Sequence, residues 1–146
     1  MCCANGRQVC GAIYVFMLHD RLIRHSDSNG RSRRQRILCL HGARSNSAVT
    51  RAQVRNLGLG DAALVHAPGP IQLDGDPAVE ELFDGPFFSW FTAESPTEEL
   101  IDTLRFLLVF IDEHGPFDGV YAFSQGAALA AALLQPDVCS LLLQQA

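Results

Sequence analysis

The chain has 146 residues, the size of one domain, and its hydrophobic share of 48% is ordinary for a globular protein. The net charge of −5 hides an asymmetry: residues 1–55 hold ten of the eleven arginines and two acids, a net +8, whereas residues 56–146 hold one arginine and fourteen acids, a net −13. This pattern predicts a basic, solvated arm on an acidic domain. It argues against nucleic-acid binding, because no aromatic residues are interleaved with the arginines.

The basic arm is expected to be a disordered N-terminal extension over residues 1–34, with the folded domain at 35–146. Residues 9–18 are apolar, but this run is too short to span a bilayer. Residues 20–36 are polar and typical of a linker. We expect a cytoplasmic protein; an Arg- and Ser-rich, acid-poor start also fits an organelle transit peptide, so that alternative stays open.

The cysteines predict neither a disulfide framework nor a metal site. Their number is odd, and no spacing matches a zinc site. Cys39 lies in a strand-like run and is expected to be a small buried hydrophobe. A reducing compartment is the simplest setting, and we expect no metal and no cofactor. The five are Cys2, Cys3, Cys10, Cys39 and Cys139.

Two short apolar runs open the domain and predict buried strands, at residues 37–40 and 62–67. The segment between them, residues 45–57, has the composition of a helix and is followed by glycines. Residues 68–95 are rich in Pro, Gly, Asp and Phe, and they predict a long loop of the kind that often carries function.

A long helix is predicted after this loop. Ser95 is expected to cap it, Pro96 to occupy its first position, and Glu98 to complete a capping box. Leucines at helical spacing follow, and His114-Gly115-Pro116 predicts the end of the helix.

The last part of the chain predicts a strand at 119–123, a helix at 125–134 and the start of a fourth strand at 138–143. Strands and helices therefore alternate, which indicates an α/β fold with a mostly parallel sheet flanked by helices. A chain that ends inside an apparent strand would expose an apolar sheet edge, so we expect a truncated form of such a fold.

The central motif is Ala-Phe-Ser-Gln-Gly at residues 122–126, where a predicted strand turns directly into a helix. This is the placement of a nucleophile elbow, usually written G-x-S-x-G, in which a sharp turn presents the serine hydroxyl at the top of the sheet. The strand and the helix then approach closely, so the flanking residues must be small, as Ala122 and Gly126 are. Ser124 is the candidate nucleophile; the other interpretation is a plain strand-to-helix turn.

A second candidate feature follows the first strand, at Leu40-His41-Gly42-Ala43. A backbone N–H in this turn and the N–H of Gln125 are placed to face the oxyanion that forms during acyl transfer. Donors of this kind are worth about 3–4 kcal/mol each. An ordinary glycine turn with a structural His41 is the alternative.

Together these segments resemble the FSH family of serine hydrolases, a branch of the α/β-hydrolases. The resemblance rests on residues 36–42, on the Trp90-Phe91 pair before an acidic helix, and above all on residues 115–128 (Gly-Pro-Phe-Asp-Gly-Val-Tyr-Ala-Phe-Ser-Gln-Gly-Ala-Ala). It runs from about Gln35 to the end of the chain. The carboxylesterase/phospholipase branch shares a similar Phe-Ser-Gln-Gly block and is the nearest confusable family.

The resemblance implies hydrolysis of small-molecule carboxylic esters or acyl thioesters through an acyl-enzyme on Ser124. It places the backbone N–H groups of Ala43 and Gln125 in the oxyanion hole. The loop before the acidic helix would line an acyl pocket, or form only a local apolar cluster. The substrate-binding candidates are His41, Phe87, Phe88 and Trp90, with Phe83 in the same loop.

The rest of a catalytic triad is missing from this sequence. In this fold an acid and then a histidine follow the serine, but Asp137 is the only acid after Ser124 and no histidine follows it. Asp137 is also too close to the motif helix to be that acid. We therefore expect the 146-residue chain to be inactive or nearly so. The alternative function is a non-catalytic binding or interaction protein that keeps the ligand pocket.

Overall fold

The computed structural model describes residues 13–16, 34–57, 59 and 61–144. These residues form a four-stranded sheet in the order β1-β6-β2-β3. The strands β2 (Arg36–Leu40), β3 (Ala63–His66) and β6 (Gly119–Phe123) are parallel, and β1 (Ile13–Phe16) pairs antiparallel with β6. The predicted α/β fold with a mostly parallel sheet is confirmed.

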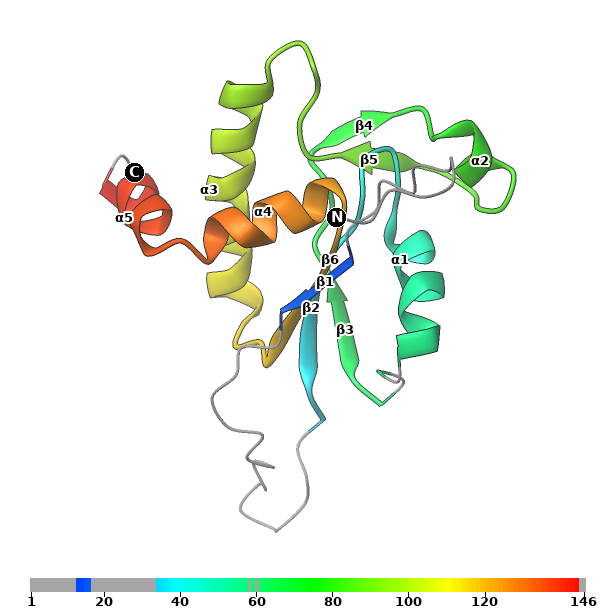
Figure 1. The fold of residues 1–146 in the computed structure, drawn as a ribbon, viewed down its shortest axis with the longest axis horizontal. Helices are drawn as coiled ribbons and strands as arrows, with labels where there is room; N and C mark the ends of the chain where they lie inside the picture. Colours follow the sequence, from blue (N-terminus) through cyan, green and yellow to red (C-terminus); the bar gives the residue numbers. More distant parts are fainter. Residues whose placement is uncertain (1–12, 17–33, 58, 60, 145–146) are drawn as a thin grey trace, which may run out of the picture.

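Helices cover both faces of this sheet (Figure 1). The helix α1 (Ser47–Val54), extended by a 3-10 turn η1 (Arg55–Leu57), packs on one face, where Val54 clusters with Ile37 and Cys39 of β2. The helices α3 (Pro96–His114) and α4 (Gln125–Leu133) pack on the other face, against Leu38 and Leu40. Successive residues of β2 therefore point to opposite cores, as the pleat of a strand requires.

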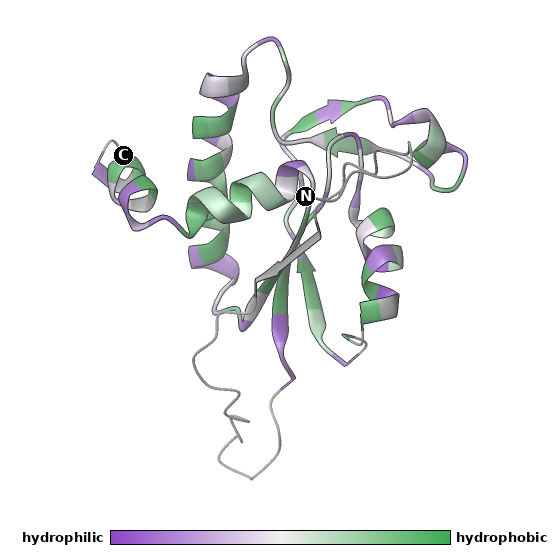
Figure 2. Ribbon diagram, in the orientation of Figure 1, coloured by the Kyte–Doolittle hydropathy of each residue, from purple (hydrophilic) through white to green (hydrophobic). Residues whose placement is uncertain are grey.

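The larger core lies between the sheet and the helices α3 and α4. It is built from apolar residues at helical spacing, including Leu104, Leu107 and Leu129, each no more than 4% exposed. Figure 2 shows that α4 is apolar along almost its whole length, and its buried residues share one cluster with residues of β2 and α3. Cys39 is 1% exposed, as expected for a small buried hydrophobe.

The base of the sheet is held by a reciprocal pair of hydrogen bonds between β2 and the segment before β6. The Arg36 N–H donates to Asp118 Oδ2 at 2.7 Å, and the Asp118 N–H donates to the Arg36 carbonyl at 2.8 Å. The Arg36 guanidinium also lies 5.7 Å from the centre of the Phe117 ring. The two strands are therefore aligned at their amino ends, which places Leu40 opposite Ala122 at their carboxyl ends.

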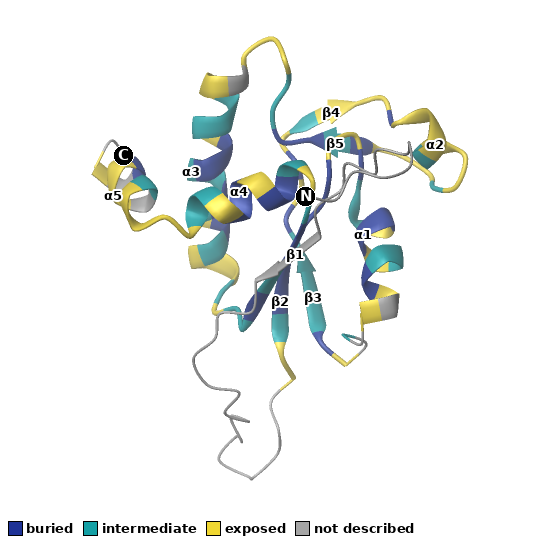
Figure 3. Cartoon of the chain, in the orientation of Figure 1, coloured by how far each residue is buried: buried dark blue, intermediate teal, exposed yellow. Residues whose placement is uncertain are grey.

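The predicted loop at 68–95 contains regular structure, so that prediction is wrong in part. A two-stranded antiparallel sheet joins β4 (Ile71–Leu73) to β5 (Phe87–Ser89), with the short helix α2 (Pro77–Glu80) between them. Elements of three or four residues are too short to show a hydrophobic period, which is why the sequence did not predict them. Figure 3 shows how exposed α2 is, and none of its residues is buried.

The predicted fourth strand at 138–143 is wrong, because Pro136–Gln144 forms the helix α5. Pro136 suits a first helical turn, and Val138 and Leu142, one helical turn apart, pack on the larger core. The expected exposed sheet edge at this end of the chain is therefore absent from the described residues.

The predicted capping box of α3 is also wrong. Ser95 has φ −134° and ψ 53° and makes no side-chain cap hydrogen bond. The neighbouring Glu99 instead accepts from the N–H and the hydroxyl of Thr92, at 2.5 and 2.9 Å, and this ties the preceding segment to the first turn. The helix ends at His114, as predicted.

Four residues of the predicted N-terminal extension form β1, and residues 1–12 and 17–33 lie outside the described part of the chain. Of the five cysteines, Cys2, Cys3 and Cys10 lie there too. No helix among the described residues is long and apolar enough to cross a membrane.

Candidate active site

Ser124 occupies the single-residue turn between β6 and α4. Its backbone has φ 51° and ψ −117°, and its side chain is exposed and forms no helix-capping hydrogen bond. A positive φ is uncommon for a residue with a Cβ and stores local strain. The Ser124 carbonyl accepts from the N–H groups of Ala127 and Ala128, at 2.9 and 3.2 Å, so the turn runs straight into the helix. The turn therefore directs the hydroxyl outward at the carboxyl end of β6.

The residues on either side of this turn are small because the backbones of α4 and β2 nearly touch. A Cβ on Gly126 would lie 2.5 Å from the Leu40 carbonyl oxygen and 2.6 Å from that of His41, far inside van der Waals contact. Ala122 is fully buried. The spacing of small residues seen in the sequence is thus explained by this close approach.

The turn after β2 lies beside Ser124. A Cβ on Gly42 would lie 2.9 Å from the Phe123 ring and 3.5 Å from the Ser124 Cβ. Ala43 follows Gly42 and is exposed, and Gln125 begins α4, where a first-turn N–H has no partner within its own helix. The two backbone groups predicted to bind an oxyanion are therefore on adjacent strand ends; their role stays a prediction.

His41 is only 4% exposed, and both of its ring nitrogens are hydrogen-bonded to the backbone. The Gly69 N–H donates to Nε2 at 3.1 Å, so Nδ1 carries the proton and donates to the Gly42 carbonyl at 2.6 Å. Burial lowers the pKa of the imidazole, and the bond to Gly42 acts in the opposite direction. His41 is held neutral, with no ring nitrogen left to contact a substrate or accept a proton.

Of the four aromatic residues predicted to line an acyl pocket, Trp90 and Phe87 are buried, whereas Phe83 and Phe88 are half-buried. Trp90 is fully buried and stacks on the His41 ring, with centroids 4.7 Å apart. Phe87 is 6% exposed and covers Gly75. Phe88 is half-buried and reaches a cavity. Phe83 is half-buried and outside the lining of that cavity. Only Phe88 of these four is positioned to contact a bound molecule there.

This cavity has a volume of about 680 Å³ and lies at the carboxyl end of β3, next to the start of α1. Besides Phe88 its lining includes Arg51, His66 and Asp84, but not Ser124. The pKa of His66 is lowered to about 4, first by burial and then by the positive charge of Arg51. His66 is therefore neutral at pH 7, and its Nε2 has no hydrogen-bond partner among the described residues.

The remaining described ionisable candidates lie away from the turn. His114, at the end of α3, contacts the Phe110 carbonyl through Nδ1 at 3.1 Å and stacks on the Phe110 ring. Asp137 is exposed in the first turn of α5. No group of three or more His, Cys, Asp or Glu side chains within the described residues is arranged to hold a metal ion.

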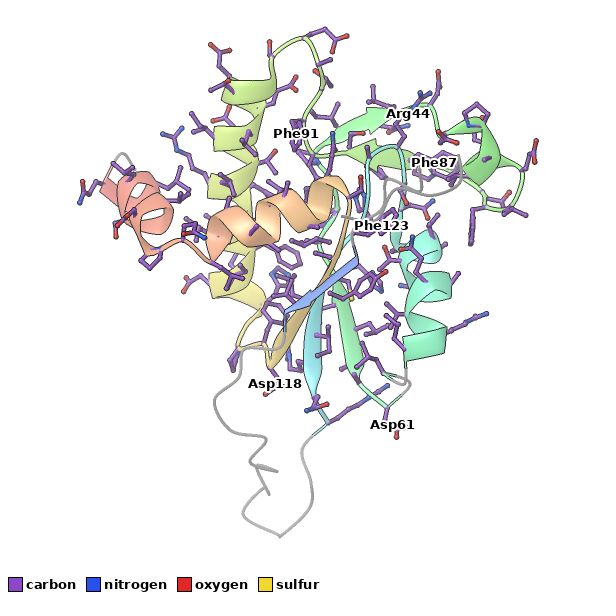
Figure 4. All side chains as sticks on the ribbon, viewed as in Figure 1. Arg44, Asp61, Phe87, Phe91, Asp118 and Phe123 are labelled. Carbon is purple, nitrogen blue, oxygen red and sulfur yellow. The ribbon has the colours of Figure 1, made fainter. Side chains whose placement is uncertain are left out.

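Sequence reasoning did not identify one feature of this site, the side chain of Gln125. Its Oε1 accepts from the Trp90 N–H at 3.1 Å, and its Nε2 donates to the Phe91 carbonyl at 2.8 Å. Figure 4 labels Phe91 and Phe123, which flank the start of α4 in that view. The partners lie 34 and 35 residues away along the chain, so no local pattern could have indicated them.

Comparison with known proteins gives one matching family, described as "Serine hydrolase (FSH1)", over residues 31–137. Similar curated proteins include "Esterase FUS5" of Gibberella moniliformis, 32% identical over 69% of this chain and 48% of its own length. "Hydrolase phiM" of Talaromyces stipitatus is 31% identical over 68% of this chain and 44% of its own length.

A third similar protein is "Rhodanese-like domain-containing protein 6" of Arabidopsis thaliana, 31% identical over 78% of this chain and 25% of its own length. The chain thus spans less than half of the length of each of these relatives. No solved structure matches the chain.

Proposed function

Because the chain belongs to the FSH1 serine hydrolase family, we propose that Ser124 is the nucleophile for cleavage of small-molecule carboxylic esters or acyl thioesters. The observation that carries the proposal is the exposed Ser124 side chain at φ 51° between β6 and α4. This geometry is what a nucleophile elbow requires. The names of the relatives, an esterase and a hydrolase, support the same class of reaction.

In the proposed reaction the Ser124 Oγ attacks the acyl carbon while its proton passes to a base. The alcohol or thiol leaves, and water then cleaves the acyl-enzyme. The carbonyl oxygen becomes an oxyanion, which the N–H groups of Ala43 and Gln125 would bind. The positive end of the α4 dipole lies at the same place and favours this negative charge.

The described residues do not supply a base for Ser124. The ring nitrogens of His41 are both occupied, and His66 lines a cavity that does not include Ser124. No histidine follows Ser124 in the sequence. A serine without a base is a weak nucleophile, and sites that lose triad members keep on the order of 10³-fold catalysis over water. We therefore expect slow reaction of the 146-residue polypeptide.

The test is covalent capture of Ser124. The purified chain is incubated with a fluorophosphonate and, separately, with an activated aryl acetate, and the modified peptide is identified by mass spectrometry. We expect slow, stoichiometric modification of the peptide that contains Ser124, and acetyl-enzyme that accumulates because the described residues offer no base for its hydrolysis either.

Two variants serve as controls. Ser124→Ala should abolish the modification, and Ser140→Ala, which removes an exposed serine on α5, should leave it unchanged. Absence of modification at saturating probe, or modification that survives Ser124→Ala, would refute the proposed nucleophile. The first of these results would favour the alternative, a binding protein without catalysis.

A further inference from the structure

We propose that residues 88–91 form a clamp that sets the position of Ala43 relative to Gln125, and that Gln125 and Trp90 act through their side chains as positioning residues. The inference rests on the proposed function, because it concerns the two backbone groups assigned to the oxyanion. An oxyanion hole acts only if its donors are fixed before the charge forms. Ala43 and Gln125 belong to different elements, so some third element has to fix their separation.

One half of the clamp holds the turn that contains Ala43, from both sides. Before Ala43, the Trp90 Nε1–H donates to the His41 carbonyl at 2.8 Å. After Ala43, the Arg44 N–H donates to Ser89 Oγ at 2.9 Å. Ser45 and Phe88 exchange backbone hydrogen bonds of 3.0 and 2.8 Å. The turn is thus fixed to consecutive residues of the clamp.

The other half of the clamp holds the start of α4. The Gln125 side-chain amide accepts from the Trp90 N–H through Oε1 and donates to the Phe91 carbonyl through Nε2. Both polar atoms of the amide group are therefore bonded to the clamp. The Trp90 carbonyl accepts from Thr103 Oγ1 at 2.6 Å, which anchors the clamp to α3. Trp90 therefore bonds to the turn after β2, to α3 and to α4 at once, and it is completely buried.

These contacts change the interpretation of Trp90. A residue that lines a substrate pocket needs an exposed face, and Trp90 has none. Its ring lies between His41 and the core, and its only polar side-chain atom bonds the residue that starts the Ala43 turn. Trp90 therefore lies between the two segments that carry the proposed donors, and it sets the distance between them.

The experiment removes the bonds between the clamp and the Gln125 side chain, and it follows the signals of the turn that contains Ala43. Gln125→Met keeps the length of the side chain and removes both of its hydrogen bonds. Trp90 is the only tryptophan, so its indole N–H gives a single signal in a ¹H–¹⁵N spectrum of the labelled chain. We expect the Trp90 indole and Ala43 amide signals to move, and the Arg44 and Ser45 amides to exchange about tenfold faster or more.

The matched control is Val54→Ala, which opens a cavity under α1 on the opposite face of the sheet. It should lower the melting temperature and leave the Ala43 and indole signals in place. Thr103→Val, which removes only the bond to the Trp90 carbonyl, should move the same signals to a smaller extent, and it serves if Gln125→Met does not fold. Ala43, Arg44 and Ser45 signals that stay unchanged while the indole signal moves would overturn the clamp.

A second readout separates this inference from the proposed function. If Ser124 reacts with the fluorophosphonate in the native chain, the rate should fall about tenfold or more in Gln125→Met, because small displacements of reacting groups are costly. The rate should be unchanged in Val54→Ala. A native chain that does not react contradicts the proposed function, and the spectra alone then decide the clamp. A rate unchanged in Gln125→Met contradicts the clamp.

Discussion

At the scale of single residues, Ser124 is notable because it adopts a backbone conformation that favours glycine. A turn with φ 51° and ψ −117° costs about 1–3 kcal/mol for a residue with a Cβ. A turn selected only for stability would use glycine, which reaches positive φ at no steric cost. A serine at such a position is consistent with a requirement for its hydroxyl.

The strain leads to a prediction about stability. Ser124→Gly should unfold with a free energy about 1 kcal/mol higher than that of Ser124→Ala, since glycine removes the strain but gains unfolded-chain entropy worth about 0.4–1 kcal/mol. Urea titration followed by Trp90 fluorescence measures both values. The alanine variant is the control, because it loses the hydroxyl and keeps the Cβ. A glycine variant no more stable than the alanine variant would show that the turn is not strained.

At the scale of elements, the site depends on how closely α4 approaches the end of β2. The Gly126 Cα has no room for a methyl group, because the Leu40 and His41 carbonyl oxygens are in the way. Those same carbonyls end the strand that leads to Ala43. The packing of a helix on a strand and the shape of the proposed oxyanion hole are therefore set by one contact.

Gly126→Ala tests this contact. In an open helix the change would stabilise by up to about 1 kcal/mol, because alanine is the better helix former. Here the clash at 2.5 Å should reverse the sign and lower the free energy of unfolding by roughly 2 kcal/mol. Ala128→Ser, at an exposed position of α4, should change it by less than about 0.5 kcal/mol. Urea denaturation of the native chain and of the two variants measures these free energies of unfolding. A neutral or stabilising effect of Gly126→Ala would exclude the close approach of α4 to β2.

The elements were predictable from the sequence where a pattern is local. Continuous apolar runs correctly predicted β2, β3 and β6, and the abrupt change after Phe123 predicted the turn at Ser124. The apolar run at 138–143 failed because a short run fits a strand or a helix equally, and only its packing on α3 and α4 distinguishes them. The clamp was not predictable, since the bonds that join it to the Ala43 turn and to Gln125 connect residues 34 to 49 positions apart.

At the scale of the whole molecule, the buried His41 and the half-buried His66 make stability depend on pH. His41 and His66 both have a pKa below the ordinary 6.5, mainly because burial disfavours the charged imidazolium. The folded chain therefore binds fewer protons than the unfolded chain at mildly acidic pH. The two rings lie at the carboxyl ends of neighbouring strands, so their protonation acts on the edge of the sheet that carries the proposed site.

The sign of the effect follows from linkage. Between pH 6.5 and about 4 the unfolded chain protonates His66 and the folded chain does not, so the free energy of unfolding falls as the pH falls. His66 is only half-buried, and solvent screening limits its share to on the order of 1–2 kcal/mol. Above pH 6.5 this contribution is fully present, and below about pH 4 it no longer changes.

His66→Gln should flatten that pH dependence. Urea denaturation at pH 7 and at pH 4.5 gives the change in the free energy of unfolding between these pH values, for the native chain and for the variant. The carboxylates contribute equally to this change in both proteins. On acidification the variant should lose less stability than the native chain, by on the order of 1–2 kcal/mol. The pH dependence that remains in the variant includes the contribution of His41. His114→Gln is the control, because that ring is exposed at the other end of the sheet. Equal slopes in the native chain and in His66→Gln would mean that His66 titrates normally and that its surroundings do not disfavour the charge.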